Sequence, residues 1–263
     1  MPSVNRIIEE TEDLTKKKFR FVPHDRLGSH AIVKIARKSM NEHIIYYRTS
    51  NDDILNHIIS HECGHIIRLF KAPESKRVMP YSGESHVKAF KESISEDLSK
   101  ISSQFSFSQI EHLLSLWLNG IIMQISNQPV DIMIEKWLYE DHPDLREVQM
   151  RSIMKQWDDA KKILSPAYRN TTPDNIYTCV NLMNYAYFRQ LGLNMGQNFI
   201  KPYNSTPFIN KGKALSSILE QITNNDYSGD LEKINKWAEF LGVNDWFGWI
   251  DFETIPEGYE QSI

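Results

Sequence analysis

The sequence has little of what marks several large classes of protein. It holds two cysteines, Cys63 and Cys179, among 263 residues. That number is too small for a disulfide framework and fits a reducing compartment. No apolar run approaches the roughly 18 residues that span a bilayer, and the N-terminal residues lack the apolar stretch of a secretory signal. We therefore expect a cytoplasmic protein without a membrane partner.

An excess of either charge is also missing. The 30 Lys and Arg residues nearly balance 34 Asp and Glu residues, which leaves a formal net charge of −4. Because nucleic acids and anionic membranes are bound through basic surfaces, neither is expected as a partner. The serine-nucleophile elbow, the P-loop and the dinucleotide-binding glycine motif do not occur either.

What the chain does have is 41% hydrophobic residues, enough for a sizeable core. The patterns predict one α+β domain over residues 1–263, dominated by helices and carrying a small N-terminal β-sheet. Residues 1–75 would supply an N-terminal helix, the sheet and a motif-bearing helix. Residues 76–263 would form the helical remainder.

Periodicity and breaker residues locate the elements. A helix is expected over 3–18, followed by two strands, AIVKIARK and HIIYYRT, that a short turn connects. Ser50 is a candidate cap for the motif helix, which Ala72 and Pro73 would end. A single apolar stripe follows, made of Val87, Phe90, Ile94 and Leu98. Further helices are expected over 107–126, 130–140, 144–164, 173–191, 211–223 and 229–241. The Asn-Gln-Pro of 127–129 would separate the first two of these helices. Gly192 would end the helix over 173–191, and residues 192–210 would form an irregular loop.

The stretch Ser60-His-Glu-Cys-Gly-His-Ile66 carries the chemistry. On a helix, His61 and His65 project from one face, one turn apart, where both imidazoles can bind one zinc ion. Glu62 lies about 100° around the helix, close enough to take a proton from a zinc-bound water. Gly64 would let another segment approach the helix closely, and Cys63 points away from the histidines. His57, one turn earlier on the same face, could reach the edge of the metal site, although a solvated position is the preferred expectation.

The H-E-x-x-H pattern, on a helix after a strand pair, resembles the zincin metallopeptidases, in which the metal helix follows an edge strand that binds substrate. HIIYYRT would be that strand. The longer metzincin pattern is absent, because Arg68 and Lys71 stand where it has glycine and a third histidine. The resemblance is therefore to gluzincins and to uncharacterised bacterial and phage-associated HExxH proteins, and it implies a third zinc ligand that is a carboxylate on a later helix.

Two regions offer that carboxylate. Asp131 and Glu135 share one helix face beside apolar neighbours, where a buried acid needs a metal or a hydrogen-bonding partner. We prefer Glu135 as ligand, with Asp131 as its supporter or substitute, although gluzincins have the glutamate first. The nearer alternative is Glu92 or Glu96. Tyr139, His142, Tyr185 and Tyr187 are the candidates to stabilise a developing oxyanion.

The resemblance implies a zinc-dependent peptidase, general or of narrow specificity, that acts on a peptide or protein substrate. The competing interpretation is a non-catalytic regulatory or interaction protein that keeps a zincin fold, in which zinc would be structural or absent. The presence of Glu62 argues against this interpretation, because a purely structural zinc site does not need that acid. The sequence leaves the substrate and the oligomeric state open.

Overall fold

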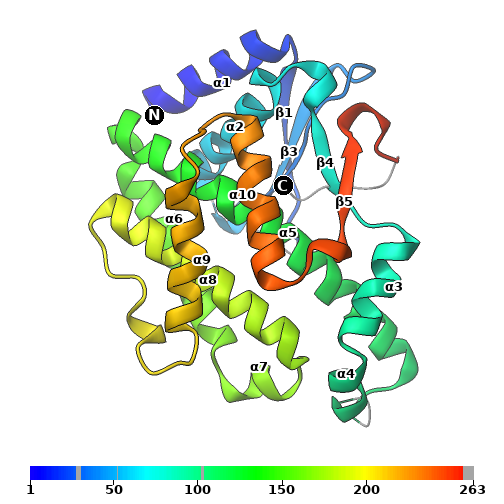
Figure 1. Ribbon diagram of the computed structural model, residues 1–263. Coiled ribbons are helices and arrows are strands. Elements are labelled where there is room, and N and C mark those ends of the chain that lie inside the picture. Colours follow the sequence, from blue (N-terminus) through cyan, green and yellow to red (C-terminus); the bar gives the residue numbers. More distant parts are fainter. Residues whose placement is uncertain (28–30, 52, 102–103, 257–263) are drawn as a thin grey trace.

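A computed structural model describes residues 1–27, 31–51, 53–101 and 104–256 (Figure 1). In chain order the elements are α1 (Pro2–Thr15), β1 (Lys18–Pro23), β2 (Ala31–Lys34), β3 (Glu42–Tyr47), α2 (Leu55–Lys71), β4 (Val78–Tyr81), α3 (Glu84–Ser93), α4 (Ser95–Ile101), α5 (Phe107–Asp141), α6 (Arg146–Ile163), α7 (Pro166–Asn170), α8 (Asp174–Met195), α9 (Ile209–Gln221), α10 (Tyr227–Leu241) and β5 (Gly248–Asp251). The chain is helix-dominated with small sheets, so the α+β class is confirmed.

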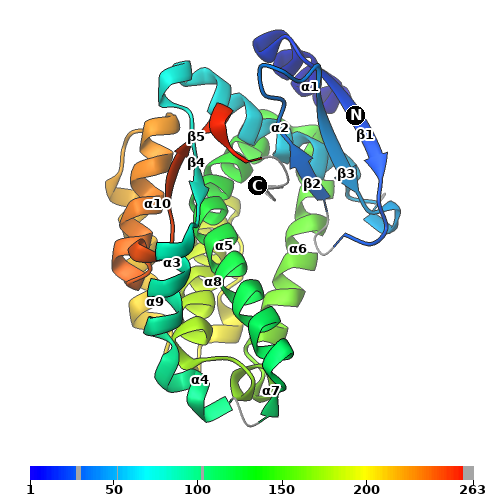
Figure 2. The same cartoon turned by 90° about the vertical axis from the view of Figure 1, so that its right-hand side faces the viewer.

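The N-terminal sheet has the strand order β1-β3-β2. β2 and β3 form the expected antiparallel pair, with Val33 opposite Ile45, whereas β1 runs parallel to β3. The expectation that HIIYYRT is an edge strand was wrong, because β1, which the sequence analysis missed, pairs with its other side. The edges of the sheet are β1 and β2. Figure 2 shows α2 between this sheet and the layer of long helices.

Helix α5 runs unbroken through the Asn-Gln-Pro sequence that was expected to divide it. Pro129 lies inside the helix and cannot donate the backbone hydrogen bond of that turn, a loss that costs about 3 kcal/mol. The flanking side chains of Ile125, Val130 and Ile132 are all buried, and this packing holds the two halves in one helix. One rigid element therefore carries both candidate acids.

Three smaller expectations were also wrong. Ser50 does not cap α2, because residues 49–51 form a separate short turn that Asp25 holds through the backbone and hydroxyl of Thr49. The apolar stripe after Val87 is split into α3 and α4 at Ile94. α8 continues past Gly192 to end at Gly196, which has the positive φ of 67° that favours glycine.

One hydrophobic cluster runs from Val4 on α1 to Ile255 near the C-terminal end of the described chain. A second sheet, β4 with β5, joins residues far apart in sequence, with Met79 opposite Ile250. Among the described helices, none has the length and apolar character that crossing a bilayer requires. The cluster lies on both sides of the contact between α2 and α5, where the candidate site is located.

Candidate metal centre

Three histidines of α2 share one face, because they are spaced four residues apart. His57 and His65 are buried, and the side chain of His61 is 15% exposed. The expectation that His57 lies in solvent was wrong: it is 1% exposed. A row of imidazoles on a buried face needs polar partners, and α5 supplies them.

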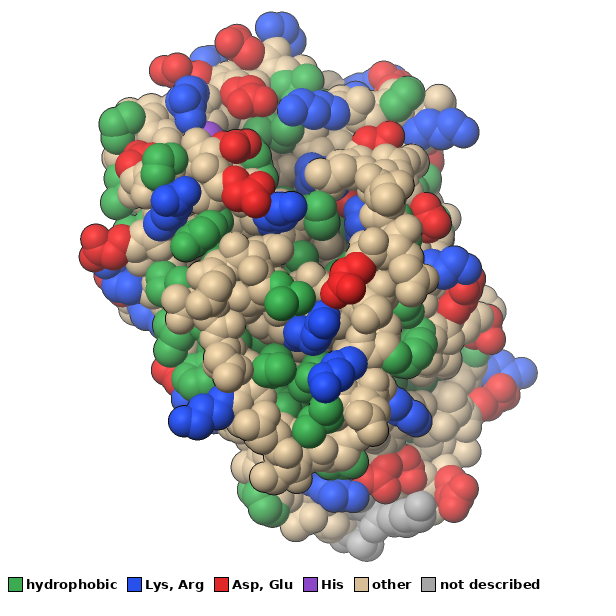
Figure 3. Space-filling view, turned by 60° about the vertical axis from the view of Figure 1, so that its left-hand side comes forward, with side chains coloured by type: hydrophobic (Ala, Val, Ile, Leu, Met, Phe, Trp, Pro, Cys, Tyr) green, Lys and Arg blue, Asp and Glu red, His purple; other side chains and the backbone are tan. Residues whose placement is uncertain are grey.

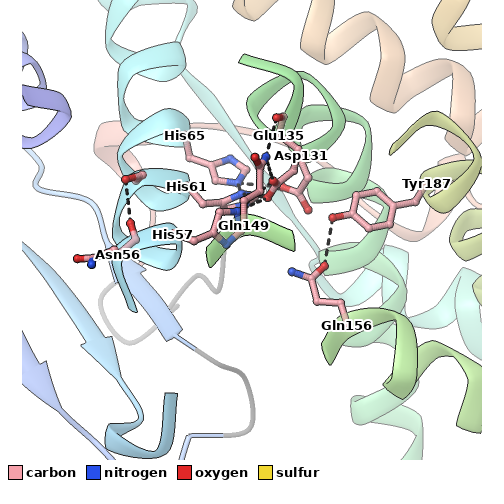
Figure 4. A network of polar contacts seen from close by, with 10 residues as sticks. Asn56, His57, His61, His65, Asp131, Glu135, Gln149, Gln156 and Tyr187 are labelled. Carbon is pink, nitrogen blue, oxygen red and sulfur yellow. Dashed lines mark hydrogen bonds and ion pairs between the residues drawn. The ribbon is translucent and has the colours of Figure 1, made fainter. Parts of the chain in front are cut away.

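Two acids of α5 face this row, one turn apart (Figure 4). Asp131 Oδ1 lies 3.3 Å from Nε2 of His61 and 3.0 Å from Nε2 of His65. The two Nε2 atoms are themselves 3.2 Å apart. Three ligand-type atoms from two helices therefore converge, and Asp131 Oδ1 is buried at the point where they meet.

Glu135 occupies a different place in the cluster. Its Oε1 accepts a hydrogen bond from Nδ1 of His61 at 2.8 Å, and Nε2 of His57 lies 2.9 and 3.0 Å from its two oxygens. Gln149 of α6 donates from Nε2 to Glu135 Oε2 at 2.6 Å. The fully buried Glu135 carboxylate is thus surrounded by hydrogen-bond partners from α2 and α6.

Gln149 was not predicted from the sequence. The spacing of His57 four residues before His61 did indicate that His57 could reach the metal edge, but a solvated position was preferred. Gln149 carried no signal, because only the packing of α6 against α5 brings it to Glu135.

The two helices approach most closely at Gly64. A Cβ atom added at Gly64 would lie 2.7 Å from Cγ2 of Ile134 on α5, closer than real carbon contacts occur. The expectation that Gly64 permits a close approach is confirmed. Ile134 lies between Asp131 and Glu135 in sequence, so this contact sets how near the acids come to the histidines.

The charges of the cluster stabilise one another. Burial raises the pKa of Asp131 and Glu135, but the adjacent histidines outweigh it and hold both pKa values well below the usual range. Burial lowers the pKa of His61, yet hydrogen bonds and charge from Asp131 and Glu135 raise it well above its ordinary value. Burial dominates at His65 and lowers its pKa. The cluster therefore favours a positive charge at the place where these atoms meet.

Glu62 is buried beside this cluster, and its Oε2 has no hydrogen-bond partner among the described residues. Burial raises the pKa of Glu62 to about 7, with His61 opposing and Asp131 adding to the shift. The neighbouring Cys63 is fully buried in the core, and burial raises its pKa to about 12. Among the described residues it does not belong to a group that could hold a metal ion.

The alternative acids lie elsewhere. Glu92 is exposed on α3 and pairs with Lys88 at 3.8 Å, and Glu96 is exposed on α4. Among the described residues, neither belongs to a group that could hold a metal ion.

Of the candidate oxyanion partners, Tyr187 is the one that projects from α8 toward the acids (Figure 4). Burial, and then the charges of Glu135 and Asp131, raise the pKa of Tyr187 well above its ordinary value. Its hydroxyl donates to Oε1 of Gln156 at 3.1 Å. The others have different surroundings: Arg146 covers the ring of Tyr139, Arg6 donates to His142, and Tyr185 packs against Gly212.

Comparisons of this chain with protein-family models, with curated proteins and with solved structures give no match.

Proposed function

We propose that this protein is a zinc-dependent metallopeptidase in which His61, His65 and Asp131 hold the metal. The observation that carries the proposal is the convergence of His61 Nε2, His65 Nε2 and Asp131 Oδ1, separated by 3.0 to 3.3 Å. Zinc binds nitrogen and oxygen at about 2.0 to 2.1 Å in a tetrahedron, whose corners are then about 3.3 Å apart. The three atoms fit one face of that tetrahedron.

The protonation pattern supports the same assignment. Because Nδ1 of His61 donates to Glu135, its Nε2 can present a lone pair toward Asp131 Oδ1. Two lone pairs facing each other in a buried site require a cation or a proton between them. A zinc ion would take the place of that proton and bind both Nε2 and Oδ1.

We assign Asp131 as the third ligand in place of Glu135, which the sequence analysis preferred. The oxygens of Glu135 are engaged by His57, His61 and Gln149, and the carboxylate lies at the Nδ1 side of His61, away from Nε2. We assign Glu135 to orienting His61. A carboxylate that accepts the second N–H of a ligand histidine fixes its tautomer and strengthens it as a ligand.

When bound, the zinc ion would polarise the scissile carbonyl and lower the pKa of an attacking water. A side chain of the protein would carry out the proton transfers. With a pKa raised to about 7, Glu62 is matched to neutral pH, so it can accept the proton of the attacking water and pass it to the leaving amine. Its unpaired Oε2 is free to receive that proton.

Tyr187 is the proposed donor to the developing oxyanion. A hydroxyl with a raised pKa keeps its proton and donates a hydrogen bond without losing it. Gln156 accepts from this hydroxyl in the present arrangement, so the substrate would replace Gln156 as the acceptor.

The test compares wild-type protein with Glu62→Gln, both loaded with zinc, on a diverse mixture of peptides whose cleavage is followed by mass spectrometry. We expect hydrolysis by the wild type and a loss of about 10²-fold or more in the variant. Zinc content, measured in parallel, should be unchanged in Glu62→Gln, because Glu62 is not a ligand. Equal hydrolysis by both proteins would overturn the assignment, and zinc binding without any hydrolysis would favour a non-catalytic role.

A further inference from the structure

A second concave site lies on the other flank of the contact between α2 and α5. It is a cavity of about 610 Å³, within the range of pockets that take small organic ligands. Met133 stands two residues after Asp131 on α5, about 200° around the helix, and lines this cavity. The cavity therefore belongs to the face of α5 turned away from the histidines, and none of the candidate zinc ligands lines it.

The floor of the cavity is apolar. It is formed by Ile67 of α2, by Met133, Ile134 and Trp137 of α5, and by Leu231 of α10. Met133, Trp137 and Leu231 remain partly exposed. An apolar body that covered these side chains would remove them from water, which stabilises a complex by roughly 25 cal/mol for each Å² buried.

Some charged groups of the rim already form ion pairs or hydrogen bonds within the protein, and others do not. Arg68 donates twice to Asp230 at 2.6 Å, and Asp226 accepts from the backbone of Ser228 and Gly229 at the start of α10. These groups are engaged within the protein and offer little to a ligand.

Two lysines of the rim are available. Lys71 reaches Glu10 at 3.6 Å in a pair whose members are 63% and 49% exposed, so the attraction is weak. Lys76 is exposed and forms no ion pair with the described residues. Glu10 itself lines the cavity together with Asp226, so Arg68, Lys71 and Lys76 leave the lining with a formal excess of one positive charge, and Lys76 carries the charge that no acid of the rim pairs.

On the face in Figure 3, basic and acidic side chains are interspersed with apolar ones. Selection by charge would then act locally, through Lys76 and Lys71.

We infer that this cavity is a binding site for a small amphipathic anion, with its hydrocarbon or aromatic body on the apolar floor and its carboxylate or sulfonate at Lys76 and Lys71. The site is separate from the proposed zinc centre and needs neither zinc nor catalysis. A ligand would nevertheless contact Gly64 and Ile134, the closest approach of the two helices that carry the metal cluster.

The test uses 8-anilinonaphthalene-1-sulfonate, an aromatic anion that fluoresces when bound, and the full-length chain. We expect saturable binding of about one dye per chain, as one cavity of this size implies. Decanoate should displace the dye, whereas decyltrimethylammonium, with the same hydrocarbon chain and the opposite charge, should not.

Paired variants locate the binding. Lys76→Glu should weaken the affinity for the dye by about fivefold or more, the effect of reversing one exposed charge. Leu231→Trp should fill the floor and abolish binding. The matched controls are Lys213→Glu and Leu193→Trp, exposed residues of α9 and α8 outside the lining. Both should bind as the wild type does.

His65→Ala should also bind the dye normally, because the cavity does not depend on the metal cluster. This result separates the cavity from the proposed peptidase activity, which His65→Ala should lose. The inference is overturned if binding is not saturable, if the cationic competitor displaces the dye as well as decanoate does, or if Lys76→Glu and Leu231→Trp bind like their controls.

Discussion

Gly64 of α2 meets Ile134 of α5 so closely that a Cβ atom on Gly64 would lie 2.7 Å from Cγ2 of Ile134. Ile134 is 1% exposed, so an added Cβ atom at residue 64 would press on a buried side chain that packs between the two helices. The absence of a side chain at residue 64 therefore sets the separation of the two helices. It thereby also sets the position of Asp131 opposite His61 and His65.

Gly64→Ala is therefore expected to destabilise the protein by about 1 to 3 kcal/mol, the usual cost of overpacking a core, and to weaken zinc binding. Urea unfolding and zinc titration measure the two effects. Gly120→Ala on α5 is the matched control, because nothing lies within 4 Å of its added Cβ atom. That variant should be neutral or stabilised by up to about 1 kcal/mol. A Gly64→Ala protein as stable as the wild type would contradict the packing argument.

The two acids should respond differently to matched isosteric changes. Asp131→Asn removes a proposed ligand charge and should abolish zinc binding, whereas Glu135→Gln should retain zinc with an affinity about 10- to 100-fold lower. Competition with a chromogenic chelator gives both affinities. If Glu135→Gln loses zinc and Asp131→Asn keeps it, the assignment of ligand and orienting residue has to be exchanged.

Tyr187→Phe should lower kcat by about 10² or more with little change in KM, because a hydrogen bond to the oxyanion acts only in the transition state. Tyr185→Phe on the same helix is the control. The Tyr185 hydroxyl is buried without a hydrogen-bond partner among the described residues, so its removal should leave kcat unchanged. Equal kcat values for Tyr187→Phe and wild type would remove Tyr187 from the mechanism.

The burial of His43 on β3, away from the metal site, predicts that the stability of the protein depends on pH. Its Nδ1 accepts from the backbone N–H of Ala36 at 2.9 Å, so the folded protein holds the ring neutral, with Nε2 3.1 Å from the Thr15 hydroxyl. Burial, and then the charge of Lys17, lower the pKa of His43 from 6.5 to about 4, against a smaller opposing effect of Glu12.

As the pH falls, His43 therefore binds a proton near pH 6.5 in the unfolded chain but only near pH 4 in the folded chain. Stability should fall as the pH drops through this window, by an amount on the order of 3 kcal/mol. Urea unfolding at several pH values measures the slope. His43→Asn should flatten it, while the exposed His112→Asn should follow the wild type. A wild-type slope that His43→Asn leaves unchanged would refute this account.

The sequence predicted those parts of the fold that depend on local pattern. The apolar face of α2, its end at Ala72 and the β2–β3 hairpin could all be read from periodicity and breaker residues. It misjudged Pro129, because the local preference of proline to end a helix is overridden by the burial of Ile125 and Val130 on either side. β1 and the β4–β5 pair are held by partners distant in sequence, which a local pattern does not reveal.

At the candidate site, too, local spacing predicted some of the residues and tertiary packing determines the rest. The spacing in Ser60–Ile66 identified His61, His65 and Glu62, and the spacing on α5 identified both acids. Which acid faces the Nε2 atoms depends on the rotation of α5 about its axis against α2, and this is set by the contact of Ile134 with Gly64. The spacing of His57 placed it on the face of His61, but its burial and the contribution of Gln149 follow from the packing of α5 and α6, which the local sequence does not reveal.

Elemental mass spectrometry of untagged protein shows whether the cluster of α2 and α5 holds zinc. Wild type, His65→Ala and the distant acid variant Glu96→Ala should be measured after identical reconstitution and buffer exchange. The account predicts about one zinc ion per chain in the wild type and in Glu96→Ala, and none in His65→Ala. A wild-type protein without zinc, or equal zinc in all three, would contradict it.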